Sequence, residues 1–521
     1  MIRNNKYIYS LILAVSLAMV GCNKDYLKTE PTSSVPEEEV FVDTDGAMVV
    51  LNGVYRSMYN SLTNHGNFGQ KSYDLVSDLM GEDMVVHTQG YSWFNTDYNY
   101  SGLSNIRSGQ RPDRTWFYYY RIIGNLNRIL SRLDDLEGEA EDKENIRGMS
   151  LALRAHSYYY LVNFFGHGGL QGPGVPIYTE PTEEGKARAT IAEVYAQIFQ
   201  DLEEAETLLD GKTRIHRSHI NLATALGIHA RAALQYGALD PSFYNVALDM
   251  SQRAITSSAL SLMDSTQYNA SGFNTLTAPE WMWGTEVIVD QSTIFASFYS
   301  HMDNRPAAGG YAALGGQKKI TKSLYDRIPA GDVRKTLFAD VASSSLPIYS
   351  QLKFQLRQAG NWASDYLFMR LSEMYLIKAE AEARTGAAAA ATQTLQSLVS
   401  KRYAAYDATT FVGGALLNEI LLQRKIELWG EGFALLDVKR LGRGLNRPAG
   451  PGNHGGDNLN GNDGSNFAPN VLTLPANSNK FLFAIPEDEI NTNNALTVAD
   501  QNPVEATPEG EDAVDSDDGS E

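Results

Sequence analysis

The chain has 521 residues and a formal net charge of -19, with 43 Lys and Arg against 62 Asp and Glu. This balance excludes an extensive nucleic-acid interface, which needs basic surface, and the single Cys excludes a disulfide framework or a Cys-rich zinc site. Hydrophobic residues make up 43%, as in an ordinary globular protein, and the 28 Tyr and 6 Trp supply aromatic surface suited to ligand stacking.

Residues 1–21 have the features of an export signal. Arg3 and Lys6 form a basic start, and residues 7–20 form an apolar run that is too short to span a bilayer. The sequence Met-Val-Gly-Cys ending at Cys22 resembles a bacterial lipobox, which implies cleavage before Cys22 and lipidation of that residue. The alternative is an ordinary secretory signal followed by an incidental Cys.

The mature chain is predicted to divide into three parts. Residues 22–45 form the lipid anchor and a polar tether, and residues 46–503 form a single helical domain. Residues 504–521 contain eight acidic residues, no basic residue and almost no large apolar side chains. Such a segment cannot bury enough surface to fold, so we expect a disordered tail.

Helices are predicted from apolar residues that recur at helical spacing. This spacing indicates helices over about 49–58, 116–136, 147–165 and 190–209. The last of them begins with Thr-Ile-Ala-Glu at 190–193, which has the form of a capping box.

Two later helix pairs share a pattern of small residues that predicts a repeat. Ala230 matches Ala379 and Ala247 matches Ala391, and small side chains at these places let antiparallel helices approach closely. The pattern resembles a degenerate tetratricopeptide repeat. The alternative is a set of ordinary Ala-rich helical hairpins. The predicted fold class is therefore mainly α, with about four helix pairs in a superhelix.

Three stretches lose the helical period and are predicted to be long irregular insertions, at about 66–114, 260–365 and 447–480. Residues 280–290 alternate enough to predict a short strand in which Trp283 is a packing residue. Residues 452–466 are rich in Asp and Asn but lack the EF-hand register, so we expect a flexible loop, with calcium as the alternative. No cofactor is predicted.

The insertions carry the candidate binding residues, because loops on a rigid scaffold commonly form binding surfaces. The aromatic and amide side chains of residues 90–100 suit a sugar, whose apolar faces stack on rings and whose hydroxyls need polar partners. The alternative is that each residue only packs its loop onto the helices. The candidates are Trp93, Asn95, Tyr98, Tyr299 and Tyr311.

No catalytic or metal constellation can be assembled from the sequence. His216 and His219 lie in a basic turn without a zinc-binding frame. Acidic pairs such as Glu203 and Glu204 are common, but a glycosidase mechanism depends on the separation of two carboxylates, which the sequence does not give.

The C-terminal third carries a more specific resemblance. Residues 370–376 (Arg-Leu-Ser-Glu-Met-Tyr-Leu), 424–428 (Arg-Lys-Ile-Glu-Leu) and 483–486 (Phe-Ala-Ile-Pro) resemble signature segments of the SusD/RagB family of surface nutrient-binding lipoproteins. Within the second segment, Arg424 and Glu427 lie three positions apart on one helix and are expected to form a structural ion pair.

The resemblance implies a tetratricopeptide-like helical protein, lipid-anchored in the outer membrane and facing the cell exterior. It implies capture of a glycan or a peptide and delivery, as a lid, to a SusC-like TonB-dependent β-barrel transporter, without catalysis. Two alternatives stay open: a structural envelope lipoprotein that binds no ligand, and a surface glycoside hydrolase.

Overall fold

The computed structural model describes residues 37–61, 64–343, 346–455 and 468–503. The predicted signal peptide, Cys22, most of the tether, most of the Asp- and Asn-rich segment at 452–466 and the acidic tail lie outside the described residues.

The described residues form a mainly α-helical protein with 17 α-helices and short strands, which confirms the predicted fold class. None of these helices is both long and apolar enough to cross a membrane. The longer helices are α3 (Thr44–Ser57), α6 (Arg111–Arg132), α7 (Ala140–Phe165), α8 (Ile191–Leu209), α9 (Leu222–Tyr236), α10 (Phe243–Ser258), α14 (Leu371–Arg384), α15 (Ala388–Val399), α16 (Gly414–Glu427) and α17 (Ala434–Leu441). The shorter helices are α2 (Glu37–Val40), α4 (Gln70–Leu79), α5 (Asn95–Asn99), α11 (Ser265–Ala270), α12 (Phe298–Met302), α13 (Lys322–Tyr325) and α18 (Glu487–Thr492).

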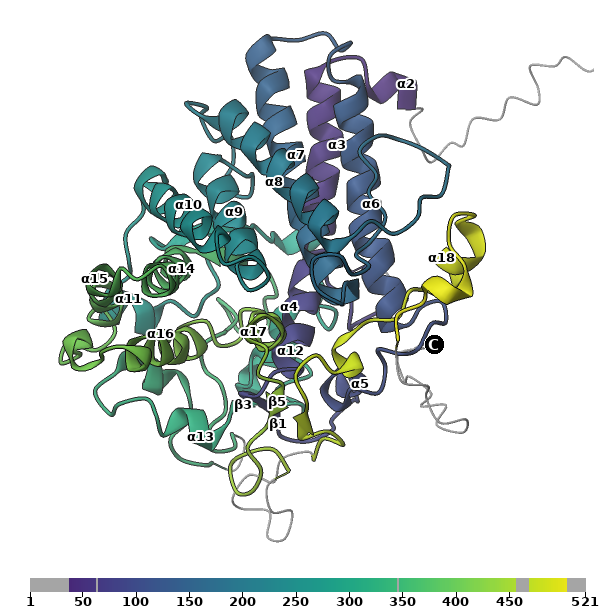
Figure 1. Cartoon of the computed structure of the whole chain (residues 1–521). Helices are drawn as coiled ribbons and strands as arrows, with labels where there is room; N and C mark the ends of the chain where they lie inside the picture. The colour runs from purple at the N-terminus through teal and green to yellow at the C-terminus, as the bar shows by residue number, and fades with distance from the viewer. Residues whose placement is uncertain (1–36, 62–63, 344–345, 456–467, 504–521) are drawn as a thin grey trace, which may run out of the picture.

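The long helices pack as successive pairs, α3 with α6, α7 with α8, α9 with α10, and α14 with α15. Each pair also contacts the next along the chain, so the helices form a continuous layered stack (Figure 1). The small residues that predicted the repeat, Ala230, Ala247, Ala379 and Ala391, are all fully buried where the helices of a pair meet.

The capping box predicted at the start of α8 is also confirmed. The Thr190 side chain accepts a hydrogen bond from the backbone nitrogen of Glu193 at 3.2 Å, and the Glu193 carboxylate accepts one from the backbone nitrogen of Thr190 at 2.7 Å. Both bonds satisfy N–H groups that have no partner within the helix, so they define where α8 begins.

The described residues contain three two-stranded antiparallel sheets in or next to the insertions, and the first of them joins two insertions. β1 (Met84–Val86) pairs with β3 (Lys318–Ile320), β2 (Trp281–Thr285) with β4 (Tyr366–Arg370), and β5 (Leu445–Asn446) with β6 (Thr473–Leu474). The strand predicted over 280–290 therefore exists but ends at Thr285. Trp283 is buried in it and its indole nitrogen donates to the carbonyl of Ser218 at 3.0 Å, which confirms its packing role.

The helical period predicted to be absent throughout residues 66–114 is present in α4. All 10 residues of α4 are buried, including the polar residues Gln70, Lys71 and Asp74. These side chains find partners inside the protein, as Gln70 does by donating to the carboxylate of Asp74 at 2.9 Å, so this short and polar segment lacks the water-facing side expected of such a helix.

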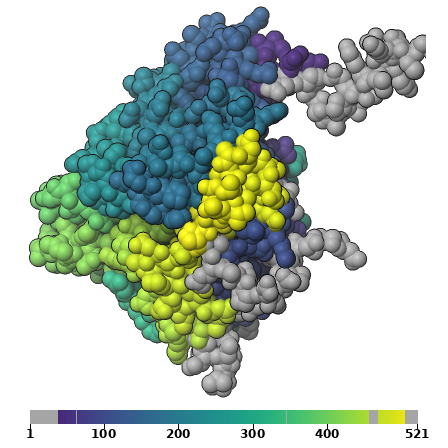
Figure 2. Space-filling model, turned by 45° about the vertical axis from the view of Figure 1, so that its right-hand side comes forward, coloured from purple at the N-terminus to yellow at the C-terminus, as the bar shows by residue number. Residues whose placement is uncertain are grey.

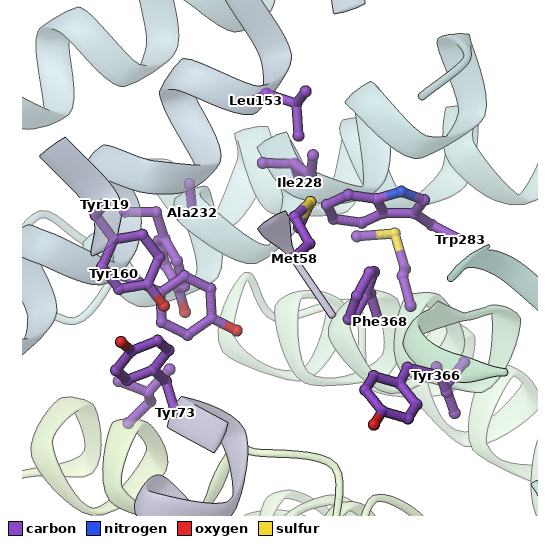
Figure 3. Packing of buried hydrophobic residues seen from close by; sticks show 14 of the residues in the cluster. Met58, Tyr73, Tyr119, Leu153, Tyr160, Ile228, Ala232, Trp283, Tyr366 and Phe368 are labelled. Atoms are coloured by element: carbon purple, nitrogen blue, oxygen red, sulfur yellow. The ribbon is translucent and has the colours of Figure 1, made fainter. Parts of the chain in front are cut away.

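Most of the abundant Tyr side chains pack the core. The rings of Tyr119 and Tyr160 stack at 5.5 Å with an interplanar angle of 7°, and Tyr73 contacts Tyr119 at 5.4 Å. Figure 3 shows these rings grouped on one side and Trp283 with Phe368 on the other, at 5.1 Å from each other. The surplus of Tyr is thus in the first place a feature of packing.

The C-terminal segment lies on the surface as a band across one face (Figure 2). Its residues 483–486 matched a family signature, and the backbone nitrogens of Phe483 and Ala484 donate to the carbonyls of Phe164 and Leu103 at 3.1 and 2.9 Å. The signature therefore marks the place where the end of the chain is fastened to the helical body.

Candidate ligand-binding site

The charged residues of the two signature helices form a buried ion cluster. The guanidinium of Arg370 lies 2.7 Å from a carboxylate oxygen of Glu427 and 2.8 Å from one of Glu280, and Arg402 lies 2.9 Å from both carboxylates. These four side chains are completely buried. The cluster therefore holds β2, β4 and α16 together and lies out of reach of a ligand.

The expected ion pair between Arg424 and Glu427 is wrong, although both residues are structural. Arg424 pairs with Asp437 of α17 at 2.8 Å, whereas Glu427 pairs with Arg370. The two side chains lie at adjacent places on α16 but meet different neighbouring elements, each of which supplies an opposite charge.

The protonation of Glu427 follows from this arrangement. Burial by itself raises the pKa of a carboxyl group, but the charges of Arg402, Arg370 and Arg334 outweigh burial and hold the pKa of Glu427 well below its usual range. Glu427 is thus an ionised partner of three guanidinium groups.

A second cluster, which we call the aromatic platform, lies at the surface and consists of His65, Tyr91, Trp93, Phe295 and Tyr311. Tyr311 is its centre, with ring centroids 5.1 Å from Tyr91, 5.7 Å from Trp93 and 5.1 Å from Phe295. His65 stacks on Phe295 at 6.0 Å, and its Nδ1 lies 2.6 Å from the hydroxyl of Tyr311. Three separate segments therefore meet in one group of rings.

The loop backbone explains how Trp93 reaches the surface. Ser92 and Phe94 on either side of it have left-handed backbones, with φ of 66° and 63°, a conformation that is costly for residues other than Gly. Phe94 is buried, whereas Trp93 is half-buried and packs against the core edge. Gly66 leaves room for the indole, because a Cβ at this position would lie 3.3 Å from a ring carbon of Trp93.

A buried His supports the platform from below. His301 stacks on Tyr311 at 5.1 Å, and its Nε2 donates to the carbonyl of His65 at 2.9 Å. Burial, together with the nearby charge of Lys318, lowers the pKa of His301 to about 3. The ring is therefore neutral at ordinary pH and fixes His65 and Tyr311 relative to each other.

The platform is an exposed apolar surface. Tyr91 is 58% exposed and Phe295 is 36% exposed. Ile294, which precedes Phe295, and Leu314, three residues after Tyr311, are 55% and 50% exposed. Grouped apolar side chains in contact with water are typical of interaction surfaces. Flat rings of this kind can stack on the apolar face of a ligand.

Of the five candidate residues, the structure brings Trp93 and Tyr311 together and places the other three in the interior. Tyr98 is fully buried, with its hydroxyl 2.6 Å from Nδ1 of His454, and Tyr299 is buried and donates to the carbonyl of Asp365 at 2.8 Å. Asn95 is also buried, at the start of α5 and three residues before Tyr98. The expectation of ligand contact is thus corrected for Tyr98, Tyr299 and Asn95, because none of them presents a free surface.

Sequence reasoning missed three members of the platform. Tyr91 lies in the same aromatic loop as Trp93 and could have been chosen on composition alone. His65 and Phe295 carry no local signal, because they belong to the platform only through contacts with rings that are distant in the sequence.

The residues considered for chemistry do not converge. His216 lies 3.2 Å from Glu286, whereas His219 lies 2.8 Å from the side-chain oxygen of Asn52. Glu203 and Glu204 lie on the exposed side of α8. Within the ranges that the structure describes, no three His, Cys, Asp or Glu side chains form a group that could hold a metal ion.

Comparisons with known proteins identify the family to which this helical-repeat scaffold belongs. A family model described as "Starch-binding associating with outer membrane" matches residues 25–234, and a model described as "SusD family" matches residues 349–504. The chain belongs to the SusD/RagB family.

Two curated relatives come from Formosa agariphila. "SusD-like protein P2" is 25% identical over 234 residues, which cover 44% of this chain and 43% of the relative. "SusD-like protein P25" is 24% identical over 163 residues, which cover 30% of this chain and 29% of the relative. The matched part therefore spans less than half the length of either relative.

Solved structures match over most of the chain. A SusD-like carbohydrate binding protein from Bacteroides vulgatus is 29% identical with a TM-score of 0.73, over 88% of this chain and 98% of that protein. Surface glycan-binding protein A from Bacteroides thetaiotaomicron, solved in complex with laminarihexaose, is 17% identical with a TM-score of 0.65, over 88% and 99%. At this identity the second likeness shows the fold alone.

Proposed function

We propose that this protein is a cell-surface binding lipoprotein that captures a glycan on its aromatic platform. The observation that carries the proposal is the set of rings around Tyr311, which are exposed, in mutual contact and held by His301 from below. The carbohydrate-binding relative of similar fold and the starch-binding description of the N-terminal family model support a glycan as the ligand.

The chemistry of the platform fits a sugar. The apolar C–H face of a sugar ring stacks on Trp93 or Tyr91, and a rigid ring loses little conformational freedom when it binds. Tyr311 is held by His65 and His301 before a ligand binds, so ligand binding loses less side-chain entropy at this residue.

The proposed setting is the outer face of the outer membrane. Lipidation at Cys22, which follows from the lipobox resemblance, would anchor the chain there, and several acyl chains anchor more stably than one. The proposed partner is a SusC-like TonB-dependent β-barrel transporter, over which the protein acts as a lid that delivers the ligand. The role is binding and delivery, without catalysis.

A screen of the purified lipid-free protein, from Asn23 onward, tests the proposal. Glycan and peptide pools are presented to the wild type and to the Trp93→Ala, Tyr311→Ala double variant, and products are analysed in parallel. Glycan binding that the double variant loses supports the proposal. Binding of peptides alone, turnover of a glycan, or no soluble ligand would instead favour peptide capture, a surface hydrolase or a purely structural lipoprotein.

The lid role needs a separate experiment. Gentle solubilisation of membranes followed by affinity purification of this protein should recover a large β-barrel partner in stoichiometric amount. Its repeated absence would leave glycan capture standing and remove the transporter from the proposal.

A further inference from the structure

A second cleft, with a volume of about 770 Å³, lies between the turn at residues 214–217, β2 and the start of α9. Its volume falls in the range of roughly 300–1,000 Å³ that small-molecule sites occupy. It shares no lining residue with the aromatic platform. We call it the arginine cleft, after the side chains described next.

Arg214 and Arg217 line this cleft without a carboxylate partner among the described residues. Arg214 donates to the carbonyls of His219 at 2.8 Å and Met282 at 3.0 Å. Arg217 is exposed and donates through Nη1 to the carbonyl of Leu276 at 2.9 Å. Nη2 of Arg214 also donates to the carbonyl of Arg217 at 2.5 Å, so the two Arg residues lie close together in a chain whose net charge is -19.

The other ionisable residues that line the cleft lie in two close pairs. Arg357 lies 2.9 Å from Asp365, and His216 lies 3.2 Å from Glu286. The lining therefore carries the three guanidinium groups of Arg214, Arg217 and Arg357 against the two carboxylates of Asp365 and Glu286, which leaves an excess of positive charge. The local potential also affects His219, whose pKa is lowered to about 4 by burial together with the charges of His216 and Arg214.

The neutral part of the lining offers both hydroxyl or amide groups and apolar surface. Asn221, Thr275 and Thr277 contribute the former, and Leu276, Trp281 and Met282 contribute the latter. This mixture matches a sugar ring, which presents hydroxyls at its edge and C–H groups on its faces. An acidic peptide would use the charges but would leave fewer of the hydroxyl-bearing side chains engaged.

We propose that the arginine cleft is a second binding site, which takes an anionic saccharide and holds its carboxylate or sulfate group on Arg217, with Arg214 adding charge beside it. In the described contacts the Arg217 guanidinium donates only through Nη1. Its Nε and Nη2 groups can therefore form the two parallel hydrogen bonds that a guanidinium makes with an oxyanion. The inference rests on the proposed function in one respect, the assumption that the ligand is a sugar.

Calorimetric titrations at low ionic strength test the proposal with defined probes: trigalacturonate, a sulfated trisaccharide, neutral maltotriose and triglutamate. The wild type is compared with Arg217→Ala and with Arg128→Ala, a matched control on the exposed face of α6. We expect at least one anionic saccharide to bind the wild type, to lose tenfold or more in affinity with Arg217→Ala, and to be unaffected by Arg128→Ala. The probe that binds distinguishes a carboxylate from a sulfate.

A second variant tests whether the anionic probe binds inside the cleft, or whether Arg217→Ala weakens binding only by lowering the charge of the protein. Thr277 lines the cleft and is exposed, so Thr277→Trp should fill the cleft and block the anionic probe while leaving the charge unchanged. The proposal is overturned if neither anionic saccharide binds, if Arg217→Ala binds as the wild type does, or if triglutamate binds more tightly than either saccharide in an Arg217-dependent way. Trp93→Ala should not change the affinity of the anionic probe, so this site and the aromatic platform can fail independently.

Discussion

The hydroxyl of Tyr311 lies 2.6 Å from Nδ1 of His65, although the two residues are 246 positions apart in the chain. This contact closes the aromatic platform by joining the segment before α4 to the long insertion between α10 and α14. Phe295 and Tyr311 already touch within the long insertion, and the platform is completed only where His65 and the loop of Trp93 join them.

Trp93→Ala should weaken glycan binding by roughly 2 kcal/mol, about a 30-fold loss, which is the usual cost of removing a central aromatic contact. The measurement is calorimetric titration with the glycan identified by the screen. Phe117→Ala is the control, because Phe117 is an exposed ring on α6 that is not part of the platform. Equal losses in both variants would contradict the assignment.

Tyr98→Phe should leave ligand affinity within about twofold of the wild type and lower the free energy of unfolding by about 1 kcal/mol. The reason is that Tyr98 is buried and its hydroxyl serves His454. Urea denaturation gives the stability, and titration with the same glycan gives the affinity. A large loss of affinity without a loss of stability would indicate that Tyr98 contacts the ligand after all.

Glu427→Gln should destabilise the protein by about 3–5 kcal/mol, because it leaves buried guanidinium groups without their counter-charge. Arg370 and Arg402 both lie within 3 Å of this carboxylate. Chemical denaturation measures the effect. Asp326→Asn is the control, since its ion pair with Lys322 is half exposed to water and should contribute little. A Glu427→Gln variant as stable as the control would show that the cluster is not structural.

His301 makes stability depend on pH in a defined direction. Its pKa is lowered to about 3 in the folded protein, whereas an unfolded His titrates near 6.5, so the unfolded state binds the proton first as pH falls. The stability due to the neutral ring is complete above about pH 6.5 and decreases as pH falls below this value. At pH 5 the free energy of unfolding should have decreased by about 2 kcal/mol.

The check on this prediction is the ring resonance of His301 followed by nuclear magnetic resonance between pH 7 and pH 4. The signal should stay that of a neutral ring throughout this range. Titration of His301 near pH 6.5 would show that its burial beneath Tyr311 is wrong.

Cys22→Ser should release the protein from the membrane fraction and abolish incorporation of labelled palmitate. The expected reason is that the lipobox Cys supplies the thiol for the lipid and, after cleavage, the amine for the acyl chain. Cell fractionation followed by immunoblotting measures the distribution. Membrane association that persists in Cys22→Ser would indicate an ordinary secretory signal and another means of attachment.

Several features could be predicted because their causes are local or periodic. The capping box at Thr190 and Glu193 depends on four consecutive residues, and the small-residue pattern around Ala230 and Ala379 depends on helical spacing. Helix α4 escaped prediction for the opposite reason, since its polar side chains are buried by segments that are distant in the sequence.

By itself, the sequence determined the helical class, the paired repeats and the family signatures, because each is written in neighbouring or regularly spaced residues. Only the tertiary structure decided which Tyr rings face water: Tyr98 and Tyr311 have the same side chain, yet one is enclosed by His454 and Arg447 while the other joins an exposed cluster. Burial is a property of contacts between distant segments, so composition could nominate aromatic residues but could not separate the core from the platform.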